Sequence, residues 1–100
     1  MVKHIIIWNF KEELSDAERT EAAAKIKSGL EGLQGKIDNL LSIKVENMPL
    51  SSSNGDLMLD STFTDEDALK GYQVNPEHLK VAQFVRSVMG GRKCFDYEVK

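Results

Sequence analysis

Four stretches of the chain are rich in apolar and β-branched residues and have the length that is typical of β-strands. They span residues 2–10, 40–48, 56–64 and 92–99. Because successive side chains of a strand point to opposite faces, the first stretch divides into two sets. One face carries His4, Ile6, Trp8 and Phe10, and the other carries Lys3, Ile5, Ile7 and Asn9. Both faces are substantially apolar, which predicts that both are covered.

The same alternation sorts the residues of the other three predicted strands. In the second strand, Leu41, Ile43 and Val45 share a face. In the third, one face carries Leu57, Leu59, Ser61 and Phe63, and the more polar face carries Met58, Asp60 and Thr62. In the last, Phe95, Tyr97 and Val99 lie opposite Cys94, Asp96 and Glu98. The turn-rich segment 49–55 predicts a mobile hairpin loop between the second and third strands.

A long helix is predicted between the first two strands. Ser15 and Glu18 form the pattern of a capping box at its start. Apolar residues then recur at helical spacing, at Ala22, Ile26, Leu30, Leu33 and Ile37. Gly35 is the predicted C-terminal cap, because glycine readily adopts the left-handed conformation that ends many helices.

Two shorter helices are predicted after the third strand. Thr64 is the expected cap of the first, on which Ala68, Leu69 and Tyr72 share one face. Pro76 disfavours helix just before it and starts the second helix, with Asn75 as its cap. The second helix carries two apolar stripes: His78, Ala82, Val85 and Met89, and Val81, Phe84 and Val88. Gly90 and Gly91 are expected to end it near Met89.

The predicted order of elements is β-α-β-β-α-α-β. It indicates an α+β, ferredoxin-like fold in which a four-stranded antiparallel sheet carries all the helices on one face. The other face would expose Ile5, Ile7, Phe95 and Tyr97, and soluble monomers rarely expose so much contiguous apolar surface. Two sheets packed face to face would cover it, so we expect a homodimer.

Composition narrows the class of protein. The 100 residues are expected to form one domain over 1–100, with 41% hydrophobic and 29% charged residues. The net charge of −3 offers no basic surface for nucleic acid, and no apolar run is long enough to span a membrane. Cys94 is the only cysteine, so no intrachain disulfide can form and a cytoplasmic location is expected. We expect its thiol to be buried in the strand rather than to act as a nucleophile.

No metal or cofactor site is expected from the sequence. Asp65, Glu66 and Asp67 form an acidic cluster, but at the start of a helix such residues complement the helix dipole. No histidine or further carboxylate lies at ligand spacing from them.

The candidate chemistry lies at the junction of the last two helices, where Tyr72 and His78 flank Asn75 and Pro76. A histidine that titrates near neutral pH suits acid–base catalysis, and a tyrosine hydroxyl suits a hydrogen bond to a substrate. The alternative is structural, with His78 as a polar residue of the first helical turn and Tyr72 as a core aromatic residue. Residue types alone favour the structural alternative.

Four segments together resemble a known family. They are VKHIIIWNFK, LLSIKVEN, YQVNPEHLKVAQFV and FDYEV. Through them nearly the whole chain resembles the stress-responsive A/B barrel domain (Dabb) family of dimeric α+β barrels. The resemblance implies a ferredoxin-like protomer whose sheet packs against that of a second copy.

One plant branch of that family, similar to olivetolic acid cyclase, closes a ring on a linear polyketide. The resemblance implies that Tyr72 and His78 would carry such chemistry here, in a cavity between the sheet and the helices. The residues expected to line the cavity are His4, Ile6, Trp8, Leu57, Leu59, Phe63 and Asp96, with Cys94 at its edge. A ligand is expected to reach it between the long helix and the turn at residues 75–78.

The cavity implied for this chain differs in shape from that of the plant branch. Bulky aromatic residues of the cyclase's first helix correspond to Ala22 and Ala23 here. A smaller residue of its first strand corresponds to Trp8. These differences weigh against the same polyketide substrate.

Three functions remain open. The first is a small-molecule-binding homodimer without assigned catalysis, holding an apolar or carbonyl-containing molecule. The second is a cofactor-independent polyketide cyclase-like or lyase-like enzyme with His78 as acid/base and Tyr72 as hydrogen-bond partner. The third, on fold analogy alone, is a cofactor-free oxygenase. The sequence favours the first, and none of the three requires a cofactor, a nucleic acid or a membrane.

Overall fold

The computed structural model describes residues 1–100 and contains four strands and three helices. Their bounds are β1 Val2–Phe10, α1 Asp16–Glu31, β2 Leu40–Glu46, β3 Leu57–Phe63, α2 Glu66–Val74, α3 Pro76–Val88 and β4 Met89–Glu98. This order confirms the predicted β-α-β-β-α-α-β sequence of elements. None of the helices combines the length and the apolar character that crossing a membrane requires.

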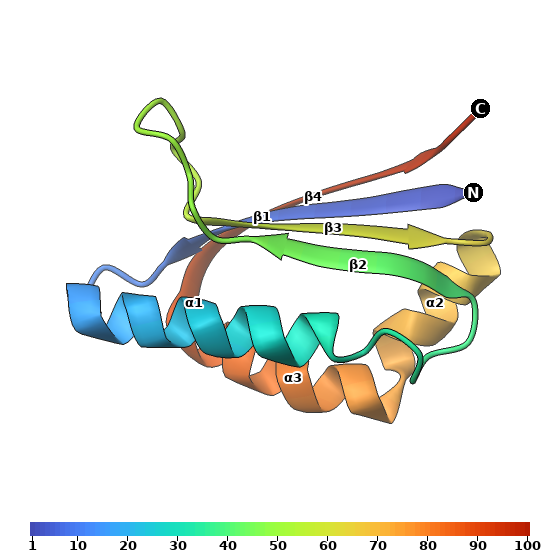
Figure 1. Cartoon of the computed structure of the whole chain (residues 1–100), viewed down its shortest axis with the longest axis horizontal. Helices are drawn as coiled ribbons and strands as arrows, with labels where there is room; N and C mark the ends of the chain where they lie inside the picture. The colour runs from blue at the N-terminus through green and yellow to red at the C-terminus, as the bar shows by residue number, and fades with distance from the viewer.

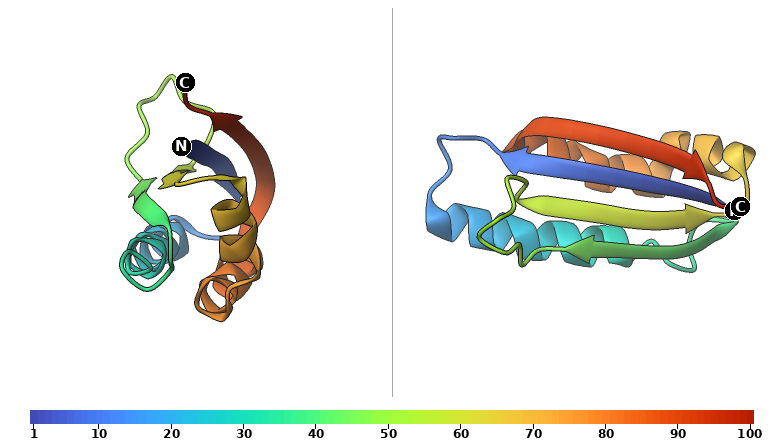
Figure 2. Two further views of the ribbon diagram at one scale, coloured as in Figure 1. Left: turned by 90° about the vertical axis from the view of Figure 1, so that its right-hand side faces the viewer. Right: turned by 90° about the horizontal axis from the view of Figure 1, so that it is seen from above.

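The strands form one antiparallel sheet in the order β2-β3-β1-β4. All three helices lie on one side of it, as predicted (Figure 1). Seen from above, α1 lies behind β2 and β3, and α3 lies behind β1 and β4 (Figure 2). The two chain ends lie together at one end of the sheet (Figure 2). There the Val99 N–H donates to the Met1 carbonyl at 2.8 Å.

Helix α1 begins at the predicted capping box and ends earlier than predicted. The Glu18 N–H donates to Ser15 Oγ at 3.2 Å, and the Ser15 N–H donates to the Glu18 carboxylate at 2.9 Å. The C-terminal cap is Gly32 rather than Gly35, which lies in the following turn with φ of +86°. Leu33 and Ile37 are nevertheless buried, because the turns after the helix keep both side chains in the core.

Close packing of α1 against α3 depends on Gly29. A Cβ atom at this position would lie 3.1 Å from Cγ1 of Val81, closer than most real Cβ contacts. Glycine therefore lets the two helices approach each other. The closer packing offsets part of the loss of helix stability that a glycine causes.

The caps of the two shorter helices are Asp65 and Asn75. The Ala68 N–H donates to Asp65 Oδ1 at 2.8 Å, so the prediction that Thr64 caps α2 is wrong by one residue. Asn75 caps α3 as predicted, because its Oδ1 accepts from the Glu77 N–H at 2.9 Å. The acidic first turn of α2 is thus explained by helix capping.

The prediction that Gly90 and Gly91 end α3 is also corrected. The helix ends at Val88, and both glycines belong to β4. Gly91 pairs with Asn9, and a Cβ on Gly90 would lie 3.4 Å from the backbone of Lys11. The glycines therefore serve a close backbone approach where β4 joins the end of β1.

The core lies between the sheet and the helices and confirms the alternation predicted for β1 and β3. The buried residues of these strands on the helix side are Val2, His4, Ile6, Trp8, Leu57, Leu59, Ser61 and Phe63. In β2 the prediction fails for Leu41, which is 47% exposed. The pairing of β2 with β3 is irregular between Leu40 and Ser42, so Leu40 takes the buried position instead.

The face of the sheet opposite the helices is open in the protomer. Ile7 and Tyr97 are exposed, Ile5 is half-buried, and Phe95 is 69% exposed. The Phe95 and Tyr97 rings lie against each other with centroids 5.9 Å apart. On the helix side of β4, Cys94 is also exposed, contrary to its predicted burial, because β4 is an edge strand with a single neighbour.

The corrected cap leads to a stability prediction. We expect Asp65→Ala to lower the free energy of unfolding by about 1 kcal/mol, because it removes the acceptor of an N-terminal N–H of α2. Thr64→Ala is the matched control and should change it by less than about 0.5 kcal/mol, because Thr64 is exposed. Urea denaturation of both variants measures the difference, and equal losses would contradict the assignment of the cap.

Candidate functional site

A cavity of about 580 Å³ lies between the helix side of the sheet and α3. Its lining comes from β1, α1, β3, α2, α3 and β4: Ile6, Trp8, Leu30, Leu59, Tyr72, His78, Ala82, Val85, Arg86, Met89, Gly90, Gly91 and Arg92. Most of these side chains are apolar. Tyr72 and His78 are the polar groups at its inner end, because Arg86 and Arg92 are exposed. An apolar cavity with few polar groups is typical of small-molecule sites.

Tyr72 and His78 form a stacked pair in this cavity. Their ring centroids are 4.1 Å apart, with 30° between the ring planes. The Tyr72 hydroxyl and His78 Nδ1 are both buried, and neither has a hydrogen-bond partner. Buried polar atoms without partners are uncommon and costly, so each of the two atoms would gain from a hydrogen-bond partner.

Burial sets the protonation states of the pair. Desolvation raises the pKa of the Tyr72 hydroxyl well above its ordinary value, so the group stays a neutral donor. Desolvation is also the main cause that lowers the pKa of His78, and the electrostatic influence of His4 and Arg86 acts in the same direction. The backbone carbonyls of Gln73 and Tyr72 oppose this shift in part. His78 is therefore neutral at neutral pH and able to accept a proton.

A second polar cluster lies on the other side of Tyr72. The ring of His4 is 6.1 Å from that of Tyr72 between centroids, and its Nδ1–H donates to the Asp96 carboxylate. Cys94 Sγ lies 3.8 Å from His4 Nδ1 and 3.5 Å from Asp96 Oδ1. His4 is 2% exposed, whereas Cys94 and Asp96 are exposed.

The structure brings some of the expected site residues together and separates others. Ile6, Trp8 and Leu59 line the cavity with Tyr72 and His78. His4 and Phe63 pack against Tyr72 instead, and the Phe63 and Tyr72 ring centroids are 5.0 Å apart.

Two expected residues lie at other hollows of the surface. Leu57 lines a hollow under the loop between β2 and β3. Asp96 lines a third hollow, of about 360 Å³, together with Lys70 and Gln73. Their roles toward a ligand of the main cavity remain predictions.

The cavity reaches solvent on a different side from the expected one. Its exposed lining residues, Arg86, Gly90 and Arg92, belong to α3 and β4, whereas α1 contributes only the buried Leu30. The lining by α3 had a signal in the sequence, because His78, Ala82, Val85 and Met89 form one predicted stripe of that helix. The lining by residues 90–92 had no signal in the sequence. Gly90 and Gly91 were assigned to a helix end, and Arg92 to the start of the last strand.

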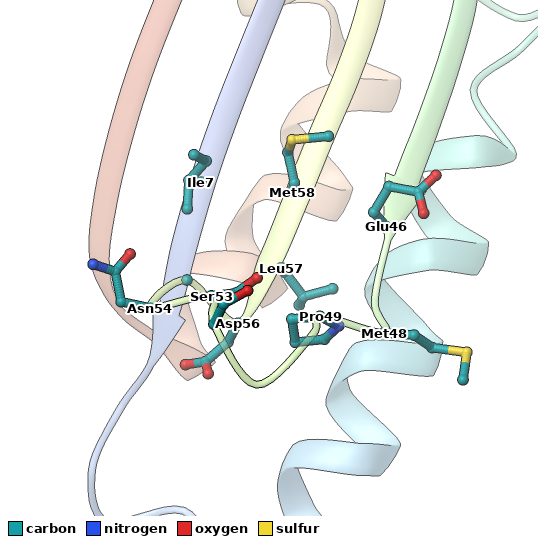
Figure 3. Close-up of a pocket in the computed structure, with 11 residues that line it drawn as sticks. Ile7, Glu46, Met48, Pro49, Ser53, Asn54, Asp56, Leu57 and Met58 are labelled. Carbon is teal, nitrogen blue, oxygen red and sulfur yellow. The ribbon is translucent and has the colours of Figure 1, made fainter.

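The loop of residues 47–56 encloses a separate hollow of about 350 Å³ against the open face of the sheet. Figure 3 shows Ile7 and Met58 on neighbouring strands, with Ser53, Asn54 and Asp56 of the loop at the strand ends. The Asp56 carboxylate accepts from the Phe10 N–H at 2.9 Å, and the Asn9 side chain donates to the Asn54 carbonyl at 2.7 Å. These bonds fix the end of the loop to β1, and its mobility stays a prediction.

Cys94 is poorly suited to act as a nucleophile. Desolvation raises the pKa of its thiol, and the hydrogen bond and charge of Asp96 raise it further. The reactive thiolate is therefore scarce at neutral pH.

Comparison with known proteins gives a family and a set of similar folds. The sequence profile of the Stress responsive A/B Barrel Domain (Dabb) family matches residues 2–99. A dimeric protein of unknown function and ferredoxin-like fold from Bacteroides fragilis is 26% identical, with 98% of this chain and 95% of that chain covered and a TM-score of 0.92. No match was found among curated proteins.

Two further structures show the same fold at lower identity. A dimeric ferredoxin-like protein of unknown function from Thermobifida fusca is 17% identical, with 98% of this chain and 90% of that chain covered and a TM-score of 0.80. The hydroxynitrile lyase from Passiflora edulis is 16% identical, with 99% of this chain and 93% of that chain covered and a TM-score of 0.74.

The lowered pKa of His78 leads to a pH prediction. Between the folded pKa and the ordinary value of 6.5, the unfolded chain binds a proton that the native protein does not. The contribution of the neutral His78 ring to the free energy of unfolding is thus complete above pH 6.5. It is lost as the pH falls toward the pKa of His78 in the folded protein. We expect the free energy of unfolding to decrease from about pH 7.5 to about pH 5.5, and less steeply in His78→Gln.

Urea denaturation across that range measures both slopes, and NMR titration of the His78 ring checks the pKa itself. The spectrum of His78→Gln assigns the His78 signal, because His4 is the only other histidine. Identical slopes for the wild type and the variant would contradict the assignment.

Proposed function

This chain belongs to the stress-responsive A/B barrel domain family, and from its cavity we propose that it binds a small, largely apolar molecule that carries a carbonyl or hydroxyl oxygen. The observation that supports this most directly is the pair of buried, unpartnered polar atoms, the Tyr72 hydroxyl and His78 Nδ1. A ligand oxygen would accept from the Tyr72 hydroxyl, and a ligand hydroxyl would donate to His78. Either bond would remove the cost of leaving these atoms unpaired.

The rest of the lining supports the same ligand class. Trp8, Leu30, Leu59 and Val85 offer apolar surface, and about 580 Å³ is within the usual range for small-molecule sites. Arg86 and Arg92 lie at the exposed side of the cavity. They would favour a ligand whose outer end is anionic, because guanidinium groups bind carboxylates through paired hydrogen bonds.

Trp8 provides a reporter for binding because it is the only tryptophan and lines the cavity. We expect an aromatic β-diketone with a carboxylate end to change the Trp8 fluorescence in a saturable way. Ala82→Phe should weaken binding by about tenfold or more, equivalent to about 1.4 kcal/mol, because it fills the cavity. Ala24→Phe is the control of equal size, since Ala24 is exposed on α1.

Removal of the polar groups tests the second part of the proposal. Tyr72→Phe should weaken binding of the diketone while leaving the free energy of unfolding unchanged or higher, because the hydroxyl has no partner to lose. Binding that is unaffected by Ala82→Phe and by Tyr72→Phe would place the ligand elsewhere and refute the proposal.

A second candidate, acid–base catalysis at the same site, is favoured by the neutral state of the half-buried His78 and by its buried Nδ1. Its Nδ1 would take a proton from a carbon next to a carbonyl, and the Tyr72 hydroxyl would donate to the developing enolate oxygen. The Passiflora edulis protein is a hydroxynitrile lyase, which places an enzyme on this fold. The oxygenase alternative rests on fold analogy alone.

Turnover separates binding from catalysis. Purified protein is incubated with β-polyketone thioesters and other carbonyl compounds that have acidic carbons, and substrate loss is followed. Turnover that His78→Ala reduces by about 100-fold or more would establish the catalytic role, because general acid–base catalysis contributes about 10²–10⁴-fold. Saturable binding with no turnover would leave the binding function alone.

We further propose that the protein is a homodimer that packs the open faces of two sheets together. Similar structures from Bacteroides fragilis and Thermobifida fusca are described as dimeric. The open face presents Ile7, Phe95 and Tyr97, and the loop after β2 rises from the same side (Figure 1). That loop carries Met48 and Leu50, which are also exposed. This surface would be covered by the same surface of a second copy.

Light scattering at micromolar concentration tests the dimer. We expect twice the mass of one chain for the wild type and a shift toward the monomer in Phe95→Glu, which places a charge in the contact. Leu79→Glu is the control, because Leu79 is an exposed apolar residue on α3, on the other side of the sheet. A monomeric wild type would refute the proposed dimer and would leave the proposal of ligand binding in the cavity unaffected.

We propose a cytoplasmic location, because Cys94 is a free, exposed thiol. Exposed single thiols persist in reducing compartments and are readily oxidised outside them.

A further inference from the structure

Three side chains with metal-binding atoms meet where β1 pairs with β4. His4 lies opposite Asp96 in the pairing, and Ile6 lies opposite Cys94. His4 Nδ1, Cys94 Sγ and an Asp96 carboxylate oxygen therefore converge on the helix side of the sheet, all within 4.8 Å of one another. These residues are close in space because of strand pairing, since His4 and Cys94 are far apart in the sequence.

Two of the three spacings between these atoms suit a tetrahedral ion. A zinc ion with Zn–S of about 2.3 Å and Zn–N or Zn–O of about 2.0–2.1 Å holds its ligand atoms roughly 3.3–3.6 Å apart. Cys94 Sγ is 3.8 Å from His4 Nδ1 and 3.5 Å from Asp96 Oδ1, close to those values. The third pair is closer than an ion would hold it, because the His4 Nδ1–H donates to Asp96 Oδ1. Binding would therefore require the ion to replace this proton and the Asp96 side chain to rotate.

We propose that His4, Cys94 and Asp96 bind one zinc ion, with a water molecule as the fourth ligand. The donor set selects this class of metal, because thiolate and imidazole ligands suit Zn²⁺ and exclude Mg²⁺ and Ca²⁺, which require oxygen ligands. Thiolate and carboxylate together balance the charge of the ion. Three protein ligands and one open position are typical of zinc sites that are accessible to small molecules.

The surroundings hold one ligand rigidly and leave the other two accessible. The Ser61 hydroxyl donates to the backbone carbonyl of His4 at 3.1 Å, and Phe63 and Tyr72 contact the imidazole edge-on. His4 is thereby fixed in the core, whereas the Asp96 side chain is 36% exposed. Cys94 is exposed as well, so an ion can reach the site from solvent and Asp96 can rotate to accommodate it.

This site is distinct from the main cavity. None of its three residues lines that cavity, and Tyr72 lies between His4 and His78. The proposal therefore does not depend on whether the cavity binds a carbonyl compound. It also differs from the acidic first turn of α2, where helix capping explains the carboxylates.

Metal binding is tested on the full chain after treatment with a chelator and a thiol-free reductant. Isothermal titration with zinc chloride should show one equivalent bound per chain, and thermal unfolding should shift upward with zinc. Cobalt(II) chloride should give the intense visible bands of a tetrahedral site and a thiolate-to-cobalt charge-transfer band. That last band reports Cys94 directly, because the chain has no other thiol.

Variants decide between this site and adventitious binding. Cys94→Ser and His4→Gln should each weaken zinc binding by about 100-fold or more, since even outer partners of metal ligands contribute about 10–100-fold. Glu98→Gln is the matched control, because Glu98 is an exposed carboxylate further along β4. Circular dichroism confirms that each variant is folded. Absence of zinc binding, or equal binding by wild type and both ligand variants, would overturn the proposal.

Discussion

The pairing of β1 with its two neighbours is the constraint on which the rest of the structure depends. β1 lies inside the sheet between β3 and β4, and its register with both is continuous over most of its length. Because side chains alternate along a strand, a shift of one residue would exchange its two faces. Trp8 would then face the open side, and Ile7 would face the helices. The cavity, the His4 cluster and the open apolar face all follow from this one register.

The site next to β1 shows a balance between stability and function. A core tyrosine and histidine would ordinarily be fixed by hydrogen bonds, yet the Tyr72 hydroxyl and His78 Nδ1 have none. Their stacking against each other and against Phe63 keeps the rings in place without satisfying those atoms. The proposed binding function rests on these unpaired atoms, because a bound ligand would satisfy them.

Local signals in the sequence predicted most of the fold. The alternation of β1 and β3, the capping box at Ser15 and the Asn75 cap each depend on residues within one element, and each is confirmed. The errors occur where a tertiary contact decides. Gly90 and Gly91 were predicted to end a helix. Instead, they allow the backbone of β4 to lie close to β1 and Lys11. Leu41 fitted the alternation of β2, but an irregularity in its pairing with β3 turned it outward.

The candidate site was predictable only in part for the same reason. The alternation of side chains along the strands, together with the family resemblance, predicted that Ile6, Trp8 and Leu59 face the helices, and the cavity uses all three. The same two signals assigned His4, Cys94 and Asp96 to that face. They did not show that these three residues converge within 4.8 Å, because convergence depends on the register between strands from opposite ends of the chain.

The cavity and the open face are linked through the stability of a small domain. A chain of 100 residues buries a modest core, and side chains that line a cavity have fewer protein packing neighbours than those of a solid core. The helix side of the sheet therefore contributes less stability than a solid core of the same size would. Association through Phe95 and Tyr97 on the opposite face would add buried apolar area without filling the cavity. A dimer formed in this way stabilises the sheet from one side and leaves the other side free to hold a ligand.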